Sequence, residues 1–90
     1  MYYTYVLQCF DFKKNKKKFY VGCTDNLPKR LIDHKTKSVE TTKIFDKIEL
    51  VYCEACLNKT DALHRENQLK TGFGRGYLKR RLANYLKTRE

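Results

Sequence analysis

The chain has 90 residues, 41% of them hydrophobic and 13% aromatic, which argues against an intrinsically disordered chain and leaves room for one core only. We therefore expect a single domain over residues 1–90. Its 20 Lys and Arg against 10 Asp and Glu leave a net charge of +10, which favours a polyanionic partner, nucleic acid first. A basic surface without such a partner, or contact with anionic lipid, is the less favoured interpretation.

The sequence predicts neither a membrane-spanning segment nor secretion. It contains no run of about 18 apolar residues, and its start lacks the basic and apolar regions of a signal peptide. We expect a cytoplasmic protein whose four cysteines are reduced thiols. Cys53 and Cys56 are spaced like half of a zinc site, but Cys9 and Cys23 stand alone on different predicted strands. A structural zinc is therefore the weaker alternative.

Three segments have the β-branched and aromatic content of strands. They are residues 2–10, 19–23 and 47–56. The segment between the first two, residues 11–18, has lysines on both sides of Asn15 and suits an exposed hairpin loop rather than a core. The first two strands are therefore expected to pair antiparallel.

A helix is expected directly after the second strand. Asp25 or Asn26 can cap its first turn, and it should run for about ten residues. Arg30 and His34 lie one turn apart on this helix, so they face the same way. The polar residues 36–43 lack any period and are expected to form a loop.

The C-terminal third is predicted to hold two more helices. One runs from Asn58 to about residue 69 and carries Glu66 in its apolar stripe, and the other covers about residues 76–88. The glycine-rich segment 71–76 is expected to be their linker. The order β-β-α-β-α-α predicts an α+β domain, in which three helices pack on a three-stranded antiparallel sheet.

Two tyrosine motifs lie on the paired strands, TYV at 4–6 and YVG at 20–22, and Arg30 follows early in the next helix. The segment ALHRENQLK at 62–70 places Glu66 in a later helix. With these residues in this order, nearly the whole chain resembles the GIY-YIG nuclease family. The first motif lacks the name-giving glycine, and the second has valine for isoleucine. Most similar is the single-domain branch related to the nuclease domain of the bacterial excision-repair incision subunit, which implies a setting in DNA repair.

The resemblance implies a metal-dependent endonuclease that hydrolyses a phosphodiester bond of nucleic acid, DNA in the first place. Glu66 would hold Mg²⁺ or Mn²⁺, because Mg²⁺ often binds through one or two carboxylates together with waters and phosphate oxygens. From the residues alone, a surface ion pair of Glu66 with Lys70 would be the favoured interpretation. Arg30 would brace the phosphate with its charged fork, although by frequency alone it is one of many surface cations.

The resemblance also implies roles for two tyrosines and a histidine. Of Tyr5 and Tyr20, one would position or deprotonate the attacking water and the other would contact phosphate. Which does which stays open, and any single tyrosine could be an ordinary sheet aromatic. His34 would contact phosphate or relay a proton, with a surface histidine as the equal alternative.

The basic hairpin and the last helix are expected to bind the nucleic-acid backbone rather than to take part in the chemistry. The predicted binding residues are Lys13, Lys14, Lys16, Lys17, Lys18, Arg75, Lys79 and Arg80. A non-catalytic nucleic-acid-binding module of the same fold is the main alternative function, and a protein that binds acidic proteins is the third. We expect a monomer or a weak homodimer.

Overall fold

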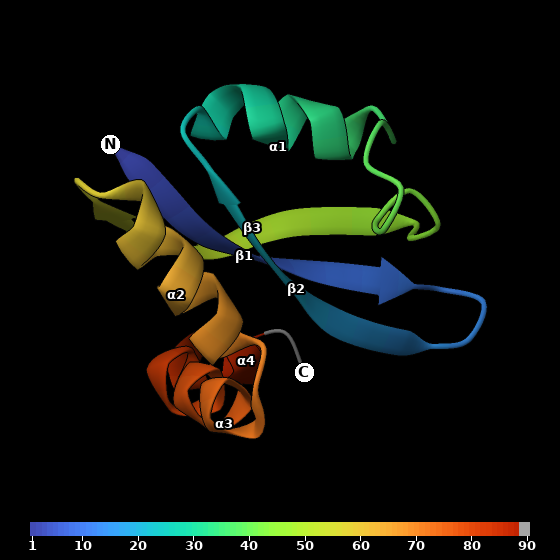
Figure 1. Ribbon diagram of the computed structural model, residues 1–90. Coiled ribbons are helices and arrows are strands. Elements are labelled where there is room, and N and C mark those ends of the chain that lie inside the picture. The colour runs from blue at the N-terminus through green and yellow to red at the C-terminus, as the bar shows by residue number, and fades with distance from the viewer. Residues whose placement is uncertain (89–90) are drawn as a thin grey trace.

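A three-stranded antiparallel sheet lies at the centre of the computed structural model, which describes residues 1–88 (Figure 1). Its strands are β1 (Tyr2–Asp11), β2 (Lys16–Thr24) and β3 (Lys47–Cys56), in the order β2-β1-β3. The helices are α1 (Leu27–Lys35), α2 (Lys59–Leu69), α3 (Gly72–Arg81) and α4 (Ala83–Thr88). In Figure 1, α1 lies apart from α2, α3 and α4, which group together. The α+β class and the antiparallel sheet are as predicted.

The central strand β1 is buried on both faces and contributes to two small cores. On one face Val6 packs with Leu69 and Leu78 of the C-terminal helices. On the other face Tyr5 and Leu7 pack against side chains of α1. Because both faces are covered, β1 is a nearly continuous apolar run rather than a clean alternation. Consecutive residues along β1, or along β2, therefore point to two different environments, one on each face of the sheet.

The prediction of three helices is wrong, because the structure has four within residues 1–88. The glycine segment is not a linker: α3 begins at Gly72, capped by the Thr71 side chain. Gly74 is needed for close packing, since a β-carbon there would lie 2.2 Å from the carbonyl oxygen of Leu69. The predicted last helix is interrupted at Leu82, whose φ of −106° and ψ of 22° end α3. No helix within residues 1–88 is long and apolar enough to cross a membrane.

The break at Leu82 has a tertiary cause rather than a local one. Leu82 itself is buried, with 8% of its surface exposed. After the bend, Tyr85 and Leu86 of α4 pack against the same core, and Tyr85 Oη donates to Glu49 Oε1 on β3 at 2.7 Å. No glycine or proline stands at the bend. A straight helix would lose these contacts of Leu82, Tyr85 and Leu86. The contacts therefore favour the interruption at Leu82.

The lysine-rich hairpin is shorter than predicted. β1 continues to Asp11 and β2 begins at Lys16, so residues 12–15 make the turn and Lys16–Lys18 belong to the strand. Asn15 closes the turn with a φ of 52°, a conformation that asparagine adopts more readily than most residues. Because β2 is an edge strand, the backbone of Lys16–Lys18 can continue the pairing with β1 while the lysine side chains stay in solvent.

Helix α2 is tied to the sheet at two points. Thr4 Oγ1 on β1 donates to the backbone oxygen of Ala62 at 2.9 Å. The guanidinium of Arg65 donates to both carboxylate oxygens of Glu54 on β3 at 2.9–3.0 Å. Together these contacts fix the rotation of α2 about its axis, and with it the direction of the Glu66 side chain that follows Arg65.

Candidate active site

Tyr5 and Tyr20 lie on the same face of the sheet, as expected from the strand pairing. The register places Tyr5 opposite Gly22 and Leu7 opposite Tyr20, so the two tyrosines are diagonal neighbours. Their ring centroids are 6.3 Å apart. Helix α1 covers this face and brings Arg30 and His34 to the same place.

A chain of hydrogen bonds runs through the Tyr5 hydroxyl. Arg30 Nε donates to Tyr5 Oη at 3.3 Å, and His34 Nε2 lies 2.8 Å from the same oxygen. On the other side of its ring, His34 Nδ1 lies 2.8 Å from Thr42 Oγ1. Because a guanidinium only donates, Tyr5 Oη accepts from Arg30, and we assign the Tyr5 proton to His34 Nε2 so that it too has a partner. The imidazole proton then resides on Nδ1, and Thr42 accepts it.

Burial keeps both Tyr5 and His34 neutral. Each is 0% exposed. Burial raises the pKa of Tyr5 to about 12, against the opposing effect of the hydrogen bond from Arg30. Burial and then the charge of Arg30 lower the pKa of His34 below its ordinary value of 6.5. At neutral pH the pair is therefore an uncharged donor and acceptor enclosed behind the surface.

Arg30 and Tyr20 are the members of the cluster that reach the surface. Both are half-buried, and the Tyr20 ring meets His34 edge-on at 5.2 Å between centroids. The hydrogen bond to Tyr5 raises the pKa of Arg30, against the opposing effect of burial. No acidic side chain within residues 1–88 forms an ion pair with Arg30. It is a fixed cation available for an anionic ligand.

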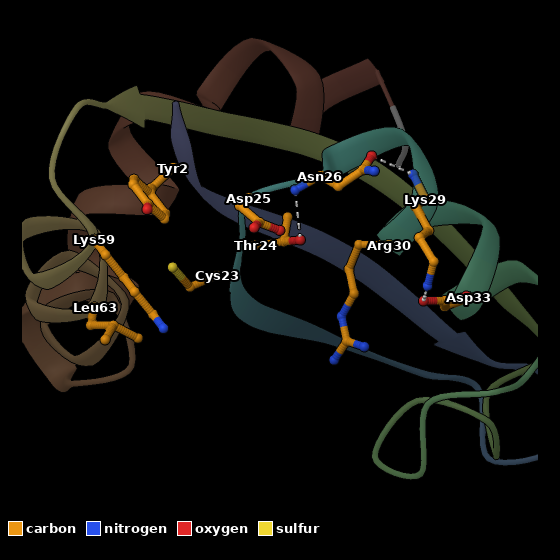
Figure 2. A pocket seen from close by; sticks show the side chains of 10 residues that line it. All are labelled: Tyr2, Cys23, Thr24, Asp25, Asn26, Lys29, Arg30, Asp33, Lys59 and Leu63. Carbon is orange, nitrogen blue, oxygen red and sulfur yellow. Dashed lines mark hydrogen bonds and ion pairs between the residues drawn. The ribbon is translucent and has the colours of Figure 1, made fainter.

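A cavity of about 450 Å³ opens beside this cluster (Figure 2). Figure 2 shows Arg30 and Lys29 on the α1 side and Lys59 on the α2 side, with Cys23 of β2 between them. Lys29 forms a 3.5 Å ion pair with Asp33. The two tyrosines and Glu66 do not line this cavity, so it adjoins the cluster only at Arg30. Its border carries three cations, Lys29, Arg30 and Lys59, and two carboxylates, Asp25 and Asp33, so the cationic excess is small.

Glu66 projects from α2 with 17% of its side chain exposed. Its carboxylate forms a 2.6 Å ion pair with Lys70, so the surface pair that the residues alone favour is present. Burial is the main cause of the raised pKa of Tyr5 and of Cys23, and the negative charge of Glu66 adds to both shifts. Glu66 thus acts electrostatically on the tyrosine cluster, although no hydrogen bond within residues 1–88 joins it to the cluster.

Metal-ligating side chains do not gather elsewhere in the described chain. No three or more His, Cys, Asp or Glu side chains within residues 1–88 come close enough to enclose a metal ion. The four cysteines are free, and Cys9 is buried. A metal would therefore depend on few protein ligands, and the role of Glu66 as one of them stays a prediction.

The predicted nucleic-acid-binding residues are all exposed, as phosphate contacts require. Lys13 and Lys14 lie in the hairpin turn, Lys16, Lys17 and Lys18 on β2, and Arg75, Lys79 and Arg80 on α3. Their part in binding remains a prediction.

Sequence reasoning missed Thr42. It lies in the polar connection between α1 and β3, where nothing in the composition distinguishes it from its neighbours. In the structure it is 0% exposed, and Val39 nearby is 7% exposed, whereas most of this loop is solvated. The loop therefore folds back over the end of α1 and supplies the fourth member of the hydrogen-bonded chain.

Comparison with known proteins shows the family to which the chain belongs. The model of the GIY-YIG catalytic domain matches residues 1–81. A UPF0213 protein of Bacillus pumilus is 35% identical over 71 residues, which cover 78% of this chain and 67% of that protein. UPF0213 proteins of Staphylococcus epidermidis and Oceanobacillus iheyensis are 34% and 33% identical, over 78% and 77% of this chain and 80% and 76% of their own lengths. No solved structure matches the chain. The chain therefore belongs to the GIY-YIG catalytic domain family, and so to a family of nucleases.

Proposed function

We propose that the protein is a metal-dependent endonuclease that hydrolyses a phosphodiester bond of DNA, with Mg²⁺ or Mn²⁺ as its ion. The observation that carries the proposal is the buried hydrogen-bonded chain of Thr42, His34 and Tyr5, which ends at Arg30. A module that only binds nucleic acid needs exposed cations. It does not need an enclosed tyrosine and histidine that hold one arginine in place. This difference favours catalysis over the binding-module alternative.

Glu66 fits the divalent metal that GIY-YIG nucleases generally use. Magnesium keeps several waters and often binds through only one or two carboxylates plus phosphate oxygens, so no protein cage is required. The present partner of Glu66 is Lys70, a flexible side chain that is 51% exposed and can turn away. When bound, the ion would polarise a phosphoryl oxygen and lower the pKa of a coordinated water.

Arg30 is proposed to bind the scissile phosphate. Its Nε is already used by Tyr5, which leaves the terminal amino groups of the guanidinium for two phosphate oxygens. The hydrogen bond from Nε also limits the rotation of the side chain. Such a prearranged cation stabilises negative charge as it develops on the phosphate, without reorganisation during the reaction.

The two tyrosines are proposed to act differently. Tyr20 is half-buried and can touch the attacking water or the phosphate, whereas Tyr5 is fully enclosed. Tyr5 is therefore proposed as a positioning residue, which accepts a hydrogen bond from Arg30 and donates one to His34 Nε2. His34 acts through Tyr5 and needs no contact with substrate. The burial of Tyr5 and the exposure of Tyr20 support this assignment among the alternatives that the sequence leaves open.

The experiment that tests the proposal compares Glu66→Gln with Glu40→Gln in single-turnover cleavage of plasmid DNA with Mg²⁺ or Mn²⁺. Glu66→Gln keeps size but removes the charge that a hard cation requires, so cleavage should fall by at least about 10² to 10³. Within residues 1–88 Glu40 pairs only with a surface lysine, and its side chain is 85% exposed, so its variant should cleave like the wild type. Binding of DNA without metal should persist in both variants. Equal cleavage rates would return the protein to the binding-module interpretation.

A further inference from the structure

A second cavity, of about 500 Å³, opens between β2 and the helices α3 and α4. Its walls carry four exposed lysines, Lys17, Lys18, Lys79 and Lys87, and its apolar part is formed by Phe19, Ala83 and Leu86. None of these lysines pairs with an acidic side chain within residues 1–88. The cavity is thus an apolar groove with a cationic border, and we call it the β2 groove.

Gln8 forms part of this groove and has no hydrogen-bonding partner for its side chain within residues 1–88. It is 4% exposed and lines the cavity. The register places it directly opposite Phe19 on β2. No fully enclosed side-chain nitrogen or oxygen within residues 1–88 lacks a hydrogen-bonding partner, so the unpaired amide of Gln8 reaches the groove, where water or a ligand can bind it. This observation is independent of the lysines.

We propose that the β2 groove binds an unpaired nucleotide of a nucleic-acid strand. Phe19 and Leu86 would contact the base, because every base has an apolar face that packs on such side chains. Gln8 has both donors and an acceptor, as a base edge does, whereas phosphate oxygens only accept. The lysines would contact the flanking phosphates. A base paired in a duplex exposes neither its face nor its pairing edge, so the groove selects an unpaired one.

The groove lies across the edge of the sheet from the candidate active site. Phe19 and Tyr20 are consecutive residues of β2, and consecutive strand residues point to opposite faces. β2 is an edge strand, so a nucleic-acid strand can pass over it. The nucleotide in the groove would then be close along the strand to the phosphate at Arg30. This refinement of the proposed function describes binding and does not depend on cleavage.

The test measures fluorescence anisotropy of a labelled oligothymidylate and of an abasic oligonucleotide of equal length, both in EDTA so that no cleavage occurs. The wild type should bind the oligothymidylate about tenfold more tightly, the effect expected of one base contact. Gln8→Leu should remove most of this preference while leaving affinity for the abasic strand unchanged. Urea unfolding should show Gln8→Leu to be about as stable as the wild type, because leucine is similar in volume and the lost amide makes no hydrogen bond within residues 1–88.

Two further measurements test the lysines of the β2 groove and the preference for an unpaired base. Lys79→Gln with Lys87→Gln should lower the salt dependence of single-strand binding by about 0.7 per lost phosphate contact, whereas the matched pair Lys35→Gln with Lys43→Gln, outside the groove, should not. A duplex of the same length should bind without any effect of Gln8→Leu. Equal affinity of the wild type for the thymidylate and abasic strands, or a preference that survives Gln8→Leu, would overturn the proposal. Because no metal is present, either result is separable from a failure of the proposed nuclease activity.

Discussion

The ring of Tyr5 lies directly over Gly22 on the neighbouring strand, so that a β-carbon at Gly22 would stand 2.4 Å from the Tyr5 hydroxyl oxygen. The Tyr5 side chain of the first tyrosine motif therefore requires a glycine at position 22, in the second motif. Tyr5 is fully buried and cannot move aside without displacing Arg30 and His34.

Gly22→Ala should therefore damage the active cluster through overpacking. We expect a loss of about 1–3 kcal/mol in the free energy of unfolding, together with reduced cleavage. Urea unfolding and single-turnover cleavage measure the two effects. Gly72→Ala is the control, since its added β-carbon meets nothing nearer than 3.7 Å. If Gly22→Ala proves as stable and active as the control, Tyr5 is not held by this contact.

The two tyrosine-to-phenylalanine variants should separate positioning from contact. Tyr5→Phe leaves Arg30 Nε and His34 Nε2 without their partner, so both stability and cleavage should fall, the former by about 1–3 kcal/mol. Tyr20→Phe alters a half-buried residue, so it should lower cleavage while changing stability by no more than about 0.5 kcal/mol. A Tyr20→Phe enzyme that cleaves at the wild-type rate would refute the proposed contact with substrate.

The pH dependence should report the neutral state of His34. Its pKa is lowered by burial and by Arg30 to below 6.5, so below 6.5 the unfolded chain binds this proton more readily than the folded chain. His34 therefore contributes stability that is present above pH 6.5 and is lost as pH falls through the folded value. Cleavage should fall over the same range, because a protonated His34 cannot accept the hydrogen bond of Tyr5 and the cluster that holds Arg30 is disturbed. His34→Gln should be less active but should lack this acid limb in urea unfolding and in rate profiles.

Thr42 should decide which nitrogen of His34 carries the proton. In the wild type, nitrogen-15 NMR should show Nδ1 protonated and Nε2 free, with the exposed His64 as an internal comparison. Thr42→Val removes the acceptor, so it should mix the tautomers and lower stability by about 1–3 kcal/mol. Thr42→Ser keeps the hydroxyl and should restore both the tautomer and cleavage. An unchanged His34 spectrum in Thr42→Val would show that Thr42 only fills space.

The sequence by itself determined the three strands, the first two helices and their order, because these depend on local chemistry. The third strand was predicted with the bounds that the structure has, 47–56. Of the two capping residues offered for the first helix, Asp25 and Asn26, the structure uses Asn26, and Asn58 caps α2. The spacing of Arg30 and His34 placed both on one face of α1. Capping and periodicity involve residues within a few positions of each other, so a single sequence contains the information.

The tertiary structure alone decided features that depend on partners distant in the chain. The helix break at Leu82 and the glycine contact at Gly74 follow from packing against the sheet and against α2. Thr42 joins the cluster because its loop folds over α1, and Tyr5 is enclosed while Tyr20 is not because β1 is central and β2 is an edge strand. Burial and hydrogen-bond direction are properties of the assembled layers. No local pattern encodes them, which is why the motif could identify the tyrosines but could not assign their roles.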